Sequence, residues 1–390
     1  MKRALRPLLV AFGVVGALEG ALFAAGRAQT ADVSSPAQRG EESKRIERER
    51  VERERELVER WRDTLLIDRP KEVLAEAEKH AADAPWNGEA LALAARAAFM
   101  ARGRDEALAW LARTPVAPET TAWIELERAR IELESDELPK ALALLLRDAN
   151  ERAPKLAPYP DAWLYTGRAW TRLGETARGA AFLARFVELA PFDVEAPSAL
   201  HALAQEALAR NDGAAATNYL RRADEHAKWQ SYRRVRVLQV RESPDEPLPR
   251  LGLAQLWLQA RDAERAKRVL AELLARCPEY AAGWFHLGEA ERLSDALPAA
   301  LEAYTKALEF EPEHVLARHN RGTIHRLAGR TSEARSDYER IVDGPRAADK
   351  TALNSHLALA RLLAASGEPE AAQRRYARYR ELGGAEALAP

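Results

Sequence analysis

The amino-acid sequence predicts an all-α protein built as a solenoid of stacked helix hairpins. Helix-forming Ala, Leu, Glu and Arg dominate the 390 residues, and the alternation of apolar and polar residues that marks strands is nearly absent. In the C-terminal half, small and apolar residues recur with a period of 34, and glycine and proline recur at fixed places within it. A fixed period of this length indicates a repeat protein, in which each unit buries its apolar side against its neighbours.

The first 28 residues carry the pattern of an export signal. Basic residues near the start precede an apolar stretch, residues 8–25, and small residues lead up to Ala28. This pattern is typical of a secretory signal peptide cleaved after Ala28. An uncleaved membrane anchor through residues 8–25 is the alternative interpretation, although this stretch is at the short limit of what spans a bilayer. Both interpretations predict export, and the second predicts a membrane tether.

The next segment changes from a polar linker to a charged helix. Residues 29–40 are polar without apolar periodicity, which predicts a disordered linker. Residues 41–66 alternate acid and base, and pairs such as Glu49 and Arg53 have the i, i+4 spacing that stabilises an exposed helix. We therefore predict a charged lead-in helix over 41–66 that docks on the first repeat. A weak heptad stripe leaves a short coiled-coil dimer open as an alternative.

The clearest repeat covers residues 281–314. Its packing and turn residues fall at offsets 4, 7, 8, 20, 24, 27 and 32 of a 34-residue unit: Trp284, Leu287, Gly288, Ala300, Tyr304, Ala307 and Pro312. In spacing and residue type this unit resembles the tetratricopeptide repeat, a helix–turn–helix unit. The resemblance implies a right-handed α-solenoid whose stacked hairpins present a concave groove to a partner.

Further units extend the array in both directions. Units 247–280 and 315–348 adjoin the first without a gap and a last unit follows, which together predict a regular array over 247–382. Upstream, residues 160–193 match well and other units are looser, which predicts a divergent array over 54–242. In total we predict eight or nine helix pairs.

Turn residues predict where helices end and where the two arrays meet. Gly174, Gly329 and Gly367 lie at offset 15, where the first helix of a unit must stop in a left-handed conformation. Three prolines within residues 243–249 predict a break between the arrays. Residues 229–242 are predicted to form an additional helix before that break.

The composition argues against several functional classes. The 59 basic and 60 acidic side chains give a formal net charge of −1, so no basic excess favours nucleic acid. The single cysteine, Cys277, excludes an intramolecular disulfide and a four-thiolate metal site. The sequence contains no phosphate-loop, zinc-protease, haem-attachment or serine-hydrolase motif. We therefore predict no nucleic-acid partner, no cofactor, no metal site and no catalytic residue.

The family resemblance also implies a partner-binding face. In tetratricopeptide repeats the first helix of each unit lines the groove, with offsets such as 2, 5, 9 and 12 facing inward. Carried over, this predicts the following partner-binding residues: Gln255, Phe285, Glu289, Arg292, His319, Asn320, Thr323, Arg326 and Arg361. Leu357 is a further candidate. The mixture of Arg, His and an aromatic residue suits a peptide of acidic character or a partner helix, and an ordinary solvated face is the open alternative.

The sequence as a whole predicts a non-enzymatic scaffold for protein–protein interaction in the bacterial cell envelope. It would be periplasmic, or anchored in the inner membrane and facing the periplasm. The alternative is an envelope polysaccharide-handling accessory protein or a helical-toroid enzyme acting on glycans. A glycan groove needs tryptophans on its inner face, whereas Trp163 and Trp284 lie at packing offsets.

Overall fold

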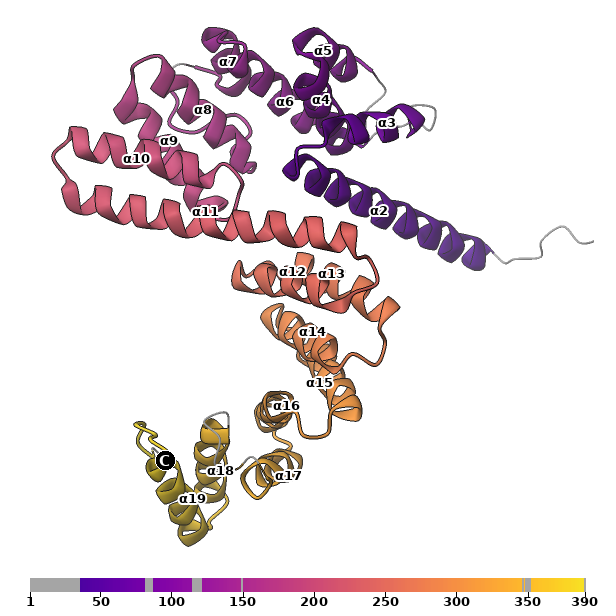
Figure 1. The fold of residues 1–390 in the computed structure, drawn as a ribbon, viewed down its shortest axis with the longest axis vertical. Coiled ribbons are helices and arrows are strands. Elements are labelled where there is room, and N and C mark those ends of the chain that lie inside the picture. Colours follow the sequence, from indigo (N-terminus) through magenta and orange to yellow (C-terminus); the bar gives the residue numbers. More distant parts are fainter. Residues whose placement is uncertain are drawn as a thin grey trace, which may run out of the picture. The chain divides into compact units, whose positions relative to one another are not determined.

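The computed structural model describes residues 36–80, 87–113, 121–148, 150–345, 347 and 352–388. These residues form eighteen α-helices and no strand, so the predicted all-α fold is confirmed over the described part (Figure 1). The predicted signal peptide or anchor, residues 1–28, lies outside the described residues, as do residues 29–35. Among the helices that are described, none is long and apolar enough to cross a membrane.

The chain divides into two units, residues 1–61 and 62–390. Most of helix α2 (Pro36–Leu66) belongs to the first unit, and its exposed acids and bases pair within the helix, as between Lys44 and Glu41 at 3.0 Å. The helix begins at Pro36, whereas the sequence analysis placed residues 36–40 in the linker. Proline is well tolerated in the first turn, because the N–H that it lacks has no partner there.

The second unit is an array of antiparallel helix hairpins. After α3 (Pro70–His80), consecutive helices pair as eight hairpins, and each packs on the next. The first four are α4 (Gly88–Arg102) with α5 (Arg104–Leu111), α6 (Thr121–Glu134) with α7 (Leu138–Leu145), α8 (Pro160–Arg172) with α9 (Thr176–Leu189), and α10 (Ala196–Ala209) with α11 (Gly213–Glu242). The last four are α12 (Pro247–Gln259) with α13 (Ala263–Arg276), α14 (Ala281–Leu293) with α15 (Leu297–Phe310), α16 (Val315–Leu327) with α17 (Thr331–Val342), and α18 (Leu353–Ala365) with α19 (Pro369–Glu381).

One residue in the left-handed conformation joins the two helices of each hairpin. These residues are Gly103, Asp136, Gly174, Asn211, Arg261, Asp295, Gly329 and Gly367, with φ between 57° and 93°. The predicted left-handed turns at Gly174, Gly329 and Gly367 are therefore confirmed. The turns at Arg261, Asp295 and Gly329 follow one another at intervals of 34 residues, so the period of the sequence is the period of the structure. In four hairpins a residue with a Cβ takes this position at some cost in strain, namely Asp136, Asn211, Arg261 and Asp295.

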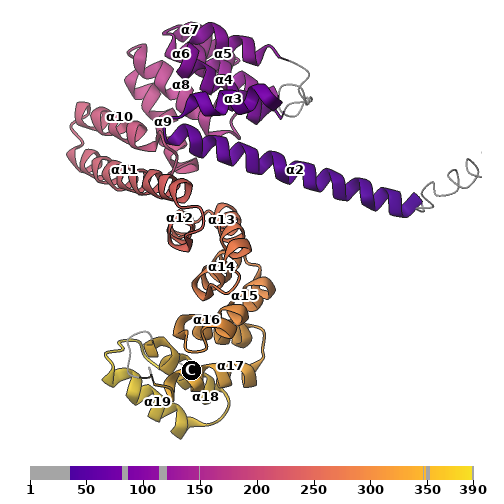
Figure 2. The same cartoon turned by 45° about the vertical axis from the view of Figure 1, so that its right-hand side comes forward.

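The predicted additional helix over residues 229–242 is wrong, because these residues are the second half of α11. This helix runs unbroken for 30 residues, and both views show it as one rod (Figures 1 and 2). No glycine or proline interrupts the sequence after Gly213, so nothing breaks its backbone hydrogen bonds. The indole of Trp229 lies 5.3 Å from that of Trp257 on α12, so α11 carries one core across the predicted break between the arrays.

In four hairpins the residue at offset 4 is hydrogen-bonded to the segment that precedes the first helix. The indole N–H of Trp163 donates to the carbonyl of Ala157 at 2.8 Å, and that of Trp284 to the carbonyl of Pro278 at 2.7 Å. Arg250 and Arg318 occupy the same offset and donate to the carbonyls of Pro244 and Pro312. All four bonds reach back six residues. A long side chain with an N–H donor is thus what the position requires, which explains how arginine replaces tryptophan in two regular units.

Candidate functional site

The predicted binding face lies on the first helices of the last four hairpins, α12, α14, α16 and α18. Its polar residues are joined by hydrogen bonds that cross from one hairpin to the next. The side-chain amide of Gln255 is hydrogen-bonded to the ring Nε2 of His286 at 2.9 Å. The amide of Asn320 donates to Oε1 of Glu289 at 2.7 Å. Both bonds join residues 31 apart, so the 34-residue period repeats the same contact along the face.

Glu289 is the centre of the densest part of this network. Besides Asn320, its carboxylate accepts hydrogen bonds from the hydroxyl of Tyr304 on α15 and from Arg292 at 3.0 Å. Burial alone would raise the pKa of Glu289, but the hydrogen bonds from Arg292, Tyr304 and Asn320 and the charge of Arg292 lower it below its usual range. The same burial, together with the carboxylate of Glu289, raises the pKa of Tyr304. At neutral pH the network therefore holds an ionised, fully engaged carboxylate.

Phe285 belongs to an aromatic cluster. Its ring lies 4.7 Å from the ring of His314 and 6.0 Å from that of Tyr304, and the side chain is partly buried. His314 accepts the backbone N–H of Ala317 at 3.2 Å and so caps α16. Phe285 is therefore held in place by Tyr304 within α15 and by His314 at the start of α16, and it presents only part of its ring to solvent.

A second group of contacts joins α16 to α17 and α18. Nδ1 of His319 is hydrogen-bonded to the buried hydroxyl of Ser355 at 2.8 Å, and burial lowers the pKa of this histidine. The hydroxyl of Thr323 lies 3.1 Å from that of Tyr338. Leu357 is only 4% exposed and packs in the interior, so it does not line the face as the sequence analysis predicted.

Three arginines are the exposed cations of the predicted face. Arg292 keeps 51% of its side chain exposed despite its bond to Glu289, and Arg326 is exposed. Arg361 on α18 is also exposed, and its guanidinium pairs with Glu386 at 3.0 Å. The structure thus places the nine predicted residues on the first helices of four successive hairpins. Most of these residues are hydrogen-bonded to their neighbours, and three of them carry exposed positive charge.

No protein-family model matches the chain. Over 70 residues it is 37% identical to the TPR repeat-containing protein PA0015 of Pseudomonas aeruginosa, a match that covers 18% of this chain and 67% of that protein. The chain belongs to the tetratricopeptide-repeat proteins.

Two solved structures match parts of the chain. A crystal structure of MamA matches with a TM-score of 0.34 and 15% identity, covering 46% of this chain and 94% of that one. The pilF protein of Pseudomonas aeruginosa matches with a TM-score of 0.33 and 16% identity, covering 57% of this chain and 91% of that one.

In the N-terminal half of this tetratricopeptide-repeat protein, the structure brings together charges that the sequence analysis missed. Glu127 on α6 is 2% exposed and pairs with Arg130 at 2.5 Å and with Arg96 on α4 at 3.1 Å. Arg96 also donates to the hydroxyl of Tyr165 on α8 at 3.0 Å. The signal is weak in the sequence, because these residues are scattered among many other charges and only the stacking of α4, α6 and α8 joins them.

Two carboxyl groups lie beside this cluster. Burial and the nearby carboxylate of Asp161 together raise the pKa of Asp193 to about 6, against the hydrogen bond from the backbone N–H of Glu195. Burial also raises the pKa of Asp161, against the charge of Arg96. A neighbouring ion pair, Arg168 with Glu195 at 2.5 Å, bridges α8 to the start of α10.

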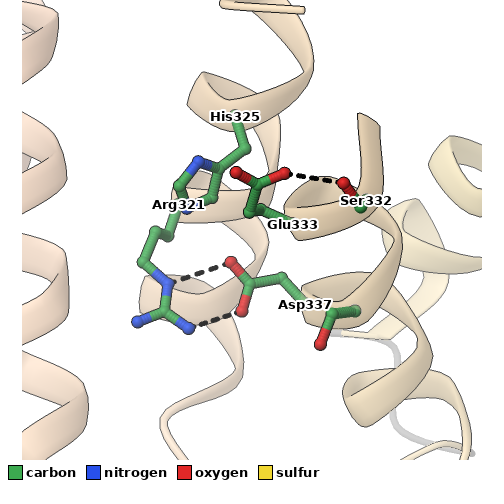
Figure 3. Close-up of a pocket in the computed structure, with 6 residues that line it drawn as sticks. Arg321, His325, Ser332, Glu333 and Asp337 are labelled. Carbon is green, nitrogen blue, oxygen red and sulfur yellow. Dashed lines mark hydrogen bonds and ion pairs between the residues drawn. The ribbon is translucent and has the colours of Figure 1, made fainter. Parts of the chain in front are cut away.

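A polar cleft of about 440 Å³ lies within the hairpin of α16 and α17. Arg321 and His325 on α16 face Glu333 and Asp337 on α17 (Figure 3). Arg321 forms a two-point ion pair with Asp337, at 2.9 and 2.5 Å, and Asp337 is almost fully buried. Arg321 and His325 lie at offsets 7 and 11, which are packing positions. In this hairpin polar contacts, including the ion pair of Arg321 with Asp337, therefore take the place of apolar ones. Within the described residues, no group of three or more His, Cys, Asp or Glu side chains is placed to hold a metal ion.

Proposed function

We propose that this tetratricopeptide-repeat protein is a non-enzymatic scaffold that binds a carboxylate-bearing peptide or partner helix along α14, α16 and α18. The observation that carries the proposal is the spacing of Arg292, Arg326 and Arg361, one exposed guanidinium on each of three successive first helices. Guanidinium groups bind carboxylates with directed hydrogen bonds.

The surroundings of these arginines support the proposal. Glu289, Asn320 and His319 are hydrogen-bonded to neighbouring hairpins, and Thr323 is hydrogen-bonded within its own hairpin. The surface around the arginines is therefore held in one arrangement before a partner arrives. Pre-organisation of this kind raises affinity, because fewer side chains lose freedom on binding. The tryptophans lend no support to a glycan-binding role: Trp163 and Trp284 are bonded to backbone carbonyls, and Trp170 and Trp257 are buried.

The proposal is tested by cross-linking the full chain in native envelope extract and identifying what it captures. The test variant carries Arg292→Glu and Arg326→Glu. The matched control carries Arg340→Glu and Arg374→Glu, the same change of charge at exposed positions of the second helices α17 and α19. We expect one protein to be captured by the wild type and the control and lost from the test variant. Equal capture by both variants would place the interface elsewhere.

We further propose that the protein works in the bacterial envelope, exported by residues 1–28. Support for this comes from the basic start and apolar stretch of the sequence. Mass spectrometry of the protein from its native cells measures the N-terminus directly. A mature chain that begins at Gln29 in the periplasmic fraction is the expected result, and an uncleaved chain in the cytosol would refute export.

A further inference from the structure

The segment that follows α19 folds back onto the last hairpin. Oε2 of Glu386 accepts from Arg361 at 3.0 Å, and the same guanidinium donates to the carbonyl of Ala387 at 3.3 Å. The backbone of Glu386 is held at both ends: its carbonyl accepts from the hydroxyl of Tyr376, and its N–H donates to the hydroxyl of Tyr379, each at 3.1 Å. Residues 383–387, the tail segment, are thus bound through a side chain and through their backbone.

The seat of the tail segment is shaped for backbone. Gly384 is buried, and a Cβ at this position would lie 2.2 Å from the ring of Tyr379. The guanidinium of Arg380 donates to the backbone carbonyl of Gly384 at 2.7 Å. Only glycine lets the chain lie this close to the tyrosine ring, so the segment is fitted to the surface of α19 and does not merely rest on it.

In the last hairpin the tail segment takes the place of a direct hydrogen bond that the two preceding hairpins form. Tyr304 and Tyr338 at offset 24 each hydrogen-bond a residue at offset 9 of their own hairpin, Glu289 and Thr323, 15 residues earlier. In the last hairpin the equivalent pair is Tyr376 and Arg361. There the link runs through Glu386, whose carbonyl meets the tyrosine and whose carboxylate meets the arginine.

We infer that Arg361, Tyr376 and Tyr379 form a binding site for a non-helical, carboxylate-bearing segment of a partner protein, and that residues 383–387 occupy this site as an intramolecular competitor. The inference rests on the proposed function and names the chemistry of its partner. The occupant is identified by the tail segment itself, which fills the site with a glutamate side chain and a non-helical backbone. A tethered segment acts at an effective concentration in the millimolar range, so a partner must bind tightly or the tail must be released first.

The test uses the full chain and a probe of known sequence, the synthetic peptide Glu381 to Pro390. In the released-tail variant, Gly384→Val collides with Tyr379 and Glu386→Gln removes the ion pair. The matched control is Glu381→Gln, which removes a carboxylate that pairs with Arg378 on the surface of α19. Saturation-transfer NMR observes the peptide and detects binding into the millimolar range.

We expect the released-tail variant to give at least about fivefold more transfer than the wild type or the control, because the tethered competitor is gone. Adding Arg361→Ala to the variant, or Glu386→Gln to the peptide, should abolish the difference. Equal transfer to wild type and variant, or transfer that survives Arg361→Ala, would overturn the inference. The NMR probe is the chain's own tail, so this experiment does not depend on finding a partner. Failure to capture a partner from extract would contradict the proposed function without changing the NMR result.

Discussion

In both arrays a polar contact between residues 31 apart joins one hairpin to the next, but the carboxylate of this contact is more deeply buried in the N-terminal array. In the N-terminal array, Arg96 bonds Glu127, 31 residues ahead, and the carboxylate is 2% exposed. In the C-terminal array, Glu289 bonds Asn320, also 31 residues ahead, and the carboxylate side chain is 23% exposed. The first contact is an ion pair with a buried carboxylate, and the second is a hydrogen bond from a neutral amide to a partly exposed carboxylate that also pairs with Arg292. The same repeat geometry therefore stabilises the packing of hairpins in the N-terminal array and positions polar side chains on the predicted binding face in the C-terminal array.

The largest expected difference between the arrays comes from removing one carboxylate in each. Glu127→Ala leaves the guanidinium of Arg130, 8% exposed, without its main partner, and we expect a loss of about 3 to 5 kcal/mol. Glu289→Ala removes a side chain that is 23% exposed, and its charged partner Arg292, 51% exposed, can be hydrated instead, so we expect a smaller loss of about 1 to 2 kcal/mol. Urea unfolding followed by circular dichroism measures both. Equal losses would mean that burial does not distinguish the two networks.

Close helix approach gives the next contrast. A Cβ on Gly179 would lie 2.7 Å from the backbone carbonyl of Gly167 and 2.2 Å from the hydroxyl of Thr171, so α8 and α9 would have to separate. The nearest atoms to a Cβ on Gly288 belong to the ring of Tyr304, at 2.5 Å, and a side chain can shift more easily than backbone. We expect Gly179→Ala to cost about 3 kcal/mol and Gly288→Ala about 1 to 2 kcal/mol. Thermal unfolding of the two variants tests this order, and the reverse order would show that backbone contact is not the tighter constraint.

These contrasts show what the sequence could and could not supply. Gly288 and Gly329 were predictable because a fixed period assigns each residue to a turn or a packing position. The network around Glu289 was predictable only as a set of positions on one face, because its bonds depend on how far α16 lies from α14. The cluster of Arg96, Glu127 and Tyr165 was not predictable, since the divergent units give no common register and ordinary charged residues carry no mark of burial.

Lowering the pH should change the stability contributed by one carboxyl group in each array in opposite directions. The pKa of Asp193 is raised to about 6 by burial and by Asp161, so its folded form holds a proton more tightly than the unfolded chain does. Its contribution to stability is therefore absent near pH 7, grows as pH falls through about 6, and is complete below about 4. The pKa of Glu289 is lowered, so its contribution is present at pH 7 and is lost as pH falls below about 4.5.

Two neutral variants separate these effects. Asp193→Asn imitates the protonated acid, so it should unfold at a higher temperature than wild type at pH 7 and lose this advantage near pH 4. Glu289→Gln should unfold at a lower temperature than wild type at pH 7, with a difference that shrinks in acid. Thermal scans of both variants between pH 8 and pH 4 provide the measurement. Parallel curves for the two would contradict the opposite directions of their pKa shifts.

The smallest expected effect concerns the turns, where both arrays place side chains in the left-handed conformation. Arg261 has a φ of 59° and Asn211 a φ of 57°. An arginine pays the full steric cost of this conformation, whereas asparagine tolerates it, and glycine removes the cost but loses more entropy on folding. We therefore expect Arg261→Gly to stabilise by about 0.5 to 1 kcal/mol and Asn211→Gly to change stability by less than about 0.5 kcal/mol. Hydrogen exchange of the helices on either side of each turn resolves changes of this size. A gain at Asn211 equal to that at Arg261 would mean that the turns are strained alike in both arrays, and that the regular period of the C-terminal array is kept by packing and not at the expense of its turns.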